Sequence, residues 1–92
     1  MILQKNLKNK NMLKTKVEIY STPACHFCQL AKEWFKEKKI DFVEYNVAAD
    51  IEKRKEMMEI TGQLGVPVIK INEDILIGFN PHKLSEILAL TV

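Results

Sequence analysis

The chain reads Val17-Glu-Ile-Tyr-Ser-Thr-Pro-Ala-Cys-His-Phe-Cys28 at the point where its regular pattern begins. The β-branched and aromatic run from Val17 to Tyr20 predicts a strand, and the Ser-Thr-Pro that follows predicts a loop. From about residue 26 to residue 39, apolar side chains recur at the spacing of one helix face. The two cysteines, Cys25 and Cys28, are therefore expected where a strand gives way to a helix.

The next segments repeat this alternation. Residues 40–47 predict a second strand, and residues 50–61 predict a second helix that Gly62 ends. Asp50 is placed to cap that helix. Ile51, Met58 and Ile60 are expected to form its apolar face.

The last third of the chain predicts a hairpin and a helix. The apolar runs 66–71 and 75–77 are separated by Asn72-Glu73-Asp74, which is expected to be a three-residue loop. Asn80 and Pro81 fit the cap and the first position of a third helix. The order β-α-β-α-β-β-α predicts an α/β fold in which a four-stranded mixed sheet carries three helices.

Length and composition limit the alternatives. Ninety-two residues suffice for one domain, and 47% hydrophobic with 28% charged residues is the balance of a folded chain. No apolar run approaches the roughly 18 residues that a membrane span needs. A net charge of +2 is too small to indicate nucleic-acid binding. Two cysteines are too few for a disulfide-scaffolded secreted protein.

The positive charge is concentrated at the start of the chain. Residues 1–14 contain four lysines and no acid, whereas residues 15–92 contain ten basic and twelve acidic side chains. The segment lacks the apolar core of a signal peptide. We expect residues 1–14 to be a flexible, solvated basic tail and residues 15–92 to form the domain. The alternative is that Met1 is an upstream start codon and that the working start is Met12. A cytoplasmic monomer is the default expectation.

The pair Cys25 and Cys28 is the reactive cluster. Residues three apart at a helix start lie on one side, so the two sulfurs can approach bonding distance. The unpaired N–H groups and the positive dipole end favour a thiolate at Cys25. Cys28 lies one turn further and should be more shielded. We therefore expect Cys25 to attack a disulfide and Cys28 to resolve the mixed disulfide.

Other interpretations of this cluster stay open. The cysteines could be an inert core pair, a structural disulfide, or half of a zinc site, although a zinc site needs four ligands and His26 is poorly placed to join both neighbours. As an imidazolium, His26 would favour the Cys25 thiolate and modulate the potential. As a solvated side chain it would do little.

A second feature is Gly65-Val-Pro-Val68 at the start of the third strand. Proline cannot donate to a sheet ladder and is confined to edges or strand starts. A cis bond at Val66-Pro67 would turn the Val66 N–H and C=O outward, where they could pair with an incoming peptide. An ordinary turn proline is the alternative.

Together these residues resemble the glutaredoxin branch of the thioredoxin-like fold over roughly residues 16–90. The markers are the Cys25–Cys28 motif followed by Ala31-Lys32, the stretch Thr61-Gly-Gln-Leu-Gly-Val-Pro-Val68, and Gly78-Phe79. The resemblance implies Cys25 and Cys28 as catalytic residues and Pro67 as a cis-proline facing them. It also implies a substrate-binding surface, formed by Thr22, Phe27, Val66, Pro67, Gly78 and Phe79.

The chain departs from the usual family pattern at three places. His26-Phe27 replaces Pro-Tyr between the cysteines, Thr22 replaces a lysine, and Ile77-Gly-Phe-Asn80 replaces Gly-Gly followed by Asp. The last two changes remove contacts that recognise the charges of glutathione. Two electron sources therefore stay open: glutathione, which these changes disfavour, and a flavoenzyme resembling thioredoxin reductase.

The resemblance thus implies a cytoplasmic dithiol–disulfide oxidoreductase whose partners are disulfide-containing proteins. No tightly bound cofactor, metal, nucleic acid or membrane is expected. The alternatives are an iron–sulfur or metal carrier of the glutaredoxin type, and an inert binding module that uses the basic tail.

Overall fold

The computed structural model describes residues 15–89. The expectation of a flexible basic tail at residues 1–14 lies outside the described residues. Within them the elements run β1 (Val17–Ser21), α2 (His26–Glu37), β2 (Val43–Asn46), α3 (Ile51–Thr61), β3 (Val68–Ile71), β4 (Asp74–Ile77) and α4 (Pro81–Ile87). This is the predicted order.

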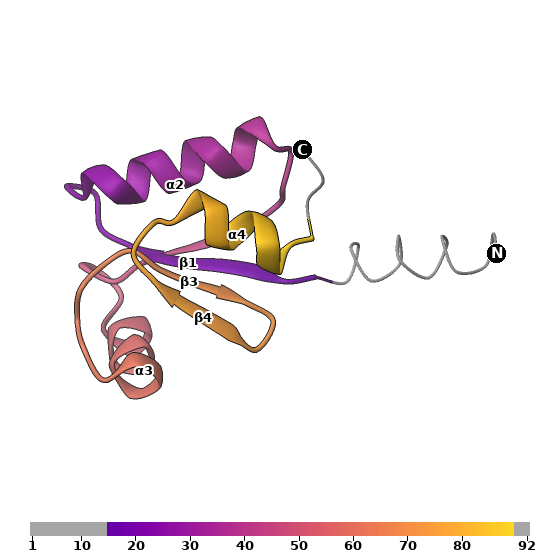
Figure 1. The fold of residues 1–92 in the computed structure, drawn as a ribbon. Helices are drawn as coiled ribbons and strands as arrows, with labels where there is room; N and C mark the ends of the chain where they lie inside the picture. The colour runs from indigo at the N-terminus through magenta and orange to yellow at the C-terminus, as the bar shows by residue number, and fades with distance from the viewer. Residues whose placement is uncertain (1–14, 90–92) are drawn as a thin grey trace, which may run out of the picture.

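The four strands form one mixed sheet in the order β2-β1-β3-β4. β1 pairs with β2 in parallel and with β3 antiparallel, and β3 pairs with β4 antiparallel. The loop that leads to Cys25 therefore follows a central strand, β1. The start of α2 and the loops that precede β3 and α4 lie at the same end of the sheet (Figure 1).

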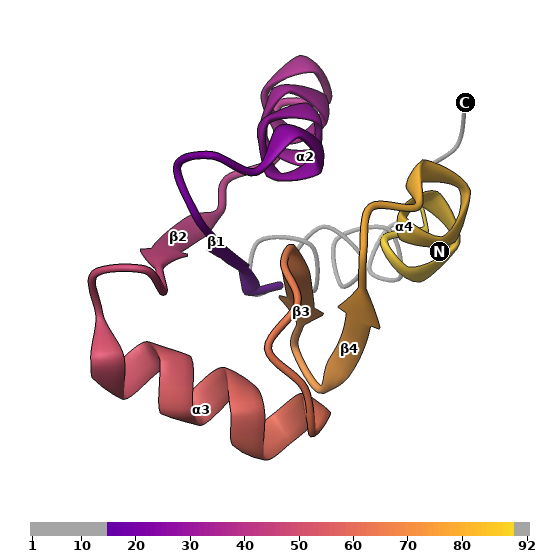
Figure 2. The ribbon, with the colours of Figure 1, turned by 90° about the vertical axis from the view of Figure 1, so that its left-hand side faces the viewer.

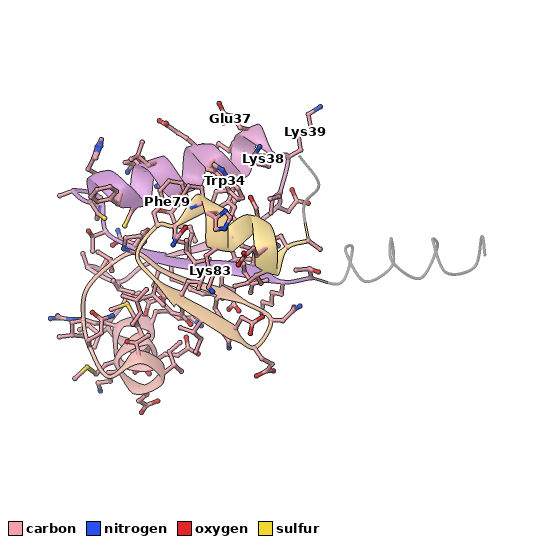
Figure 3. The ribbon with its side chains drawn as sticks, viewed as in Figure 1. Trp34, Glu37, Lys38, Lys39, Phe79 and Lys83 are labelled. Atoms are coloured by element: carbon pink, nitrogen blue, oxygen red, sulfur yellow. The ribbon has the colours of Figure 1, made fainter. Side chains whose placement is uncertain are left out.

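Helices cover both faces of the sheet. Figure 2 shows α2 and α4 on one face and α3 on the other. Alternation along β1 sends Ile19 into the core beneath α2 and α4, where it packs with Phe35 and Leu84. The next residue, Tyr20, points to the opposite face and packs with Met57 of α3. On the first face, the rings of Trp34 and Phe79 meet where α2 approaches α4 (Figure 3).

The helix ends carry the predicted capping residues. The Asp50 carboxylate accepts the Lys53 N–H at 3.1 Å, and the Asn80 side chain accepts the Lys83 N–H at 3.1 Å. Gly62 ends α3 with φ 72°, a left-handed conformation that favours glycine. These contacts fix where α3 and α4 begin, and hence where the loops beside them run.

The predicted face of α3 is wrong. Ile51 is 65% exposed and Met58 is 44% exposed, whereas Met57 is fully buried against Tyr20. Ile60 does lie at the core, as expected. The sequence does not indicate which of the two adjacent methionines is buried, because the apolar residues of this helix do not follow a clear helical spacing.

The second and third strands are shorter than predicted. After α2 the chain still turns, because Lys39 has φ 59° and the Ile40 N–H donates back to the Phe35 carbonyl at 2.8 Å. β2 therefore begins at Val43, not at residue 40. β3 begins at Val68, after a proline that has no N–H to donate to the ladder.

The hairpin loop is also shorter than predicted. Asp74 pairs with Ile71, so the loop contains two residues, Asn72 and Glu73. Asn72 adopts φ 54°, a conformation that asparagine tolerates well. Its side chain also accepts the Lys16 N–H at 2.9 Å.

Within the described residues, no helix is both long enough and apolar enough to cross a membrane.

The two methionines of α3 provide a direct test of the fold. We expect Met57→Ala to lower the free energy of unfolding by about 2–5 kcal/mol, because it leaves a cavity beneath Tyr20. Met58→Ala is the matched control and should change it by no more than about 0.5 kcal/mol. Urea denaturation followed by circular dichroism measures both. Equal effects of the two substitutions would contradict the observed orientation of α3.

Candidate active site

The first cysteine begins helix α2. Cys25 is the N-cap residue, with an extended backbone (φ −87°, ψ 113°), and its Sγ accepts the Cys28 N–H at 3.1 Å. The helix thus directs an otherwise unpaired N–H at this sulfur. The positive end of the helix dipole therefore faces this sulfur. Cys25 is also half-buried, so part of its surface stays open to solvent.

The second cysteine lies behind the first. Cys28 is fully buried, and both cysteines are free thiols. Burial raises the pKa of Cys28 to about 12, with a further rise from its hydrogen bond with Cys25. A hydrogen bond with the Thr22 backbone and the positive charge of Lys32 act in the opposite direction. The two sulfurs therefore differ strongly in accessibility.

The Val66-Pro67 peptide bond is cis, as one of the two sequence interpretations predicted. Pro67 is buried, and the Cys25 thiol faces the Val66 carbonyl with 3.8 Å between sulfur and oxygen. On the other side, the Pro67 carbonyl accepts the Gly78 N–H at 2.8 Å. Gly78 has φ 93°, which only glycine adopts without strain. The chain before β3 is thus held between the cysteines and β4.

A hydrogen-bond network explains the Thr61-Gly-Gln-Leu-Gly motif. The Gln63 side chain spans the loop, accepting the Gly65 N–H at 2.6 Å and donating to the Gly65 carbonyl at 3.1 Å. The Thr61 hydroxyl donates to the Met57 carbonyl at 2.7 Å, which ties the loop to α3. A Cβ on Gly65 would lie 2.7 Å from the Gln63 Oε1. The motif therefore fixes the segment that delivers Val66 to Cys25.

The remaining predicted site residues differ in their surroundings. Phe27 is 58% exposed beside the cysteines, and the His26 ring packs edge-on against it, with centroids 5.6 Å apart. Thr22 is half-buried in the loop before Cys25, and its carbonyl accepts the Cys25 N–H at 3.3 Å. Phe79 is half-buried and packs on Trp34. The modulating role of His26 and the substrate-binding roles stay predictions.

A polar cluster one helical turn from Cys28 was not predicted from the sequence. Glu44 Oε2 of β2 accepts the Ser21 hydroxyl at 2.7 Å and the Lys32 ammonium at 2.7 Å. These two bonds are the main causes that lower the pKa of Glu44, so its carboxylate is charged. Lys32 follows Cys28 by one helical turn. The i,i+4 spacing of Cys28 and Lys32 was visible in the sequence, but the sequence did not indicate that Lys32 pairs with Glu44 on β2.

No group of three or more His, Cys, Asp and Glu side chains within residues 15–89 is arranged to hold a metal ion.

The fold and the paired cysteines define a dithiol protein of the thioredoxin-like class. Residues 17–76 match the glutaredoxin family. A glutaredoxin-like 8.6 kDa protein in the rubredoxin operon of Clostridium pasteurianum is 46% identical over 72 residues, covering 78% of this chain and 96% of that protein. Glutaredoxin 3 of Escherichia coli K12 is 36% identical over 56 residues, covering 61% and 68% respectively.

Solved structures agree on the fold. A mutant of a thioredoxin-like protein superposes with a TM-score of 0.78 at 26% identity, covering 83% of this chain and 97% of the other. A glutaredoxin from Archaeoglobus fulgidus gives a TM-score of 0.71 at 23% identity, covering 79% and 85%. The chain belongs to the glutaredoxin family and is a thiol–disulfide oxidoreductase.

The different accessibility of the two sulfurs predicts selective alkylation. At about pH 8, iodoacetamide should label Cys25 in the reduced, folded protein and leave Cys28 unmodified, because Cys28 is buried and its raised pKa keeps it protonated. Peptide mass spectrometry reports the site. Labelling in urea is the control and should modify both residues. Comparable labelling of Cys28 in the folded protein would contradict the assignment.

Proposed function

We propose that this chain reduces disulfide bonds of other proteins in the cytoplasm, with Cys25 as the nucleophile and Cys28 as the resolving thiol. One observation carries the proposal: Cys25 Sγ is partly open at the helix start and faces the Val66 carbonyl, while Cys28 is enclosed behind it. The cytoplasm is the proposed compartment because thiol-based reduction needs a reducing thiol pool.

The first step is an exchange at Cys25. Its thiolate attacks one sulfur of the substrate disulfide, a new bond forms between Cys25 and that sulfur, and the other substrate sulfur leaves as a thiolate. The Cys28 N–H holds the attacking sulfur at the helix start before the reaction. The backbone of Val66 would pair with the substrate chain, as an added strand pairs with a sheet edge.

The second step is resolution by Cys28. Its thiolate attacks Cys25 Sγ in the mixed disulfide, the Cys25–Cys28 bond forms, and the substrate leaves with both of its sulfurs reduced. The Cys25–Cys28 pair has given two electrons to the substrate and is now oxidised to a disulfide. An external thiol or a flavoenzyme must return them.

Serine substitutions separate the two roles. Cys25→Ser should abolish insulin reduction, whereas Cys28→Ser should accumulate mixed disulfides with substrate proteins because the resolving sulfur is missing. Non-reducing gel electrophoresis followed by mass spectrometry detects the adducts. Adducts that form on Cys25→Ser instead of Cys28→Ser would reverse the assignment of nucleophile and resolver.

For the electron source, we propose a flavoenzyme resembling thioredoxin reductase. Thr22 and the Ile77-Gly-Phe-Asn80 segment lack the charged side chains that would hold the ends of glutathione. Insulin turnover with thioredoxin reductase and NADPH should therefore exceed turnover with glutathione and glutathione reductase by about tenfold or more, the factor that about 1.4 kcal/mol of lost binding represents. Faster turnover with glutathione would contradict this proposal and leave the roles of Cys25 and Cys28 intact.

A further inference from the structure

Lys32 occupies an unusual environment for a lysine. Its side chain is only 17% exposed, and its ammonium lies 2.7 Å from Glu44 Oε2. Lysines are rarely this enclosed unless they are paired. Glu44 is in turn anchored by the hydroxyl of Ser21, a residue that is only 1% exposed. The ammonium is therefore held in place and cannot move freely into solvent.

The position of this charge matters because of Cys28. Lys32 lies at i+4 from Cys28 on α2, so both residues share one side of the helix. The positive charge of Lys32 acts on the Cys28 thiol and lowers its pKa, against the larger effect of burial.

The need for such a charge arises in the resolution step. Cys28 must become a thiolate while it is buried, which costs free energy unless a positive charge or a hydrogen bond compensates. In the mixed disulfide Cys25 carries no thiolate, so its charge no longer opposes ionisation of Cys28. What remains is burial, opposed by the Thr22 backbone and Lys32.

We propose that Lys32, held in place by Glu44 and Ser21, is a positioning residue that promotes resolution by stabilising the Cys28 thiolate. The inference rests on the proposed function of Cys25 and Cys28. In the step concerned, the Cys28 proton passes to solvent, the Cys28–Cys25 bond forms, the bond between Cys25 and the substrate breaks, and the substrate sulfur leaves as a thiolate. No further oxidant or reductant takes part.

The groups acting on Cys28 set the sign of the pH effect. Cys25 and Lys32 at the start of α2 act on Cys28 directly. Glu44 on β2 binds Lys32, and the charge of Lys36 helps to lower the pKa of Glu44. The segment 64–67 before β3 contains no titratable side chain, and the loop after β1 contributes the Thr22 backbone. Removing the Lys32 charge therefore disfavours the thiolate and moves the pH midpoint of resolution upward.

The size of the effect is limited by a compensation. The fall in the thiolate fraction is partly offset, because a more basic thiolate attacks faster. We therefore expect a net loss in the resolution rate near neutral pH of about threefold. Attack by Cys25 itself should not change.

Stopped-flow reaction of the full-length reduced protein with stoichiometric DTNB separates these steps. The first release of thionitrobenzoate reports attack by Cys25, and the second reports resolution by Cys28. We expect Lys32→Met to slow the second phase about threefold, to move its pH midpoint upward and to leave the first phase unchanged. Lys32→Arg should retain the wild-type second phase, because it keeps the charge and a bond to Glu44.

Lys36→Met is the matched control, because it removes an exposed lysine one turn further along the same helix. It should leave both phases unchanged. The inference about Lys32 would be overturned if the second phase of Lys32→Met kept the wild-type rate and pH midpoint. It would also be overturned if Lys36→Met slowed the second phase equally, or if Lys32→Arg did not restore the wild-type rate. None of these outcomes would affect the proposed function. Absence of a fast first phase in the wild-type protein would instead overturn the proposed function.

Discussion

The active site depends on one constraint, namely that helix α2 begins at Cys25. The hydrogen bond from the Cys28 N–H to Cys25 Sγ makes the sulfur of the proposed nucleophile a helix cap. A helix cap contributes about 1 kcal/mol to stability, so folding of α2 itself favours the reactive geometry. The helical turn that follows buries Cys28. One sulfur is therefore partly exposed and the other is enclosed, and the proposed order of the two exchange steps rests on that difference.

The sheet order brings the second half of the site to these cysteines. β1 lies between β2 and β3, so the loop after β1 and the loop before β3 meet at one end of the sheet (Figure 1). Gln63 and Thr61 hold the second loop from the α3 side, and Gly78 holds Pro67 from the β4 side. The segment that carries the Val66 carbonyl is thus held from two sides, by contacts near α3 and after β4.

The features of the structure that the sequence predicted correctly are those with local signals. The cysteine spacing, the order of elements and the caps at Asp50 and Asn80 each depend on residues within a few positions of one another. The buried face of α3 was predicted wrongly because Met57 and Met58 are chemically identical neighbours, and only packing against Tyr20 distinguishes them. The Lys32–Glu44 pair was missed because it joins a helix to a strand 12 positions away, and no local pattern encodes that contact.

The central claim is that the Cys25–Cys28 pair donates electrons to protein disulfides. Its most direct test is the equilibrium reduction potential of the Cys25–Cys28 disulfide, measured against a thiol–disulfide buffer with thiol trapping. Dithiol proteins that act as reductants lie at about −200 to −270 mV, and this pair should fall within that range. A value close to about −120 mV, which is typical of a strong oxidant, would mean that the protein forms disulfides and would contradict the account.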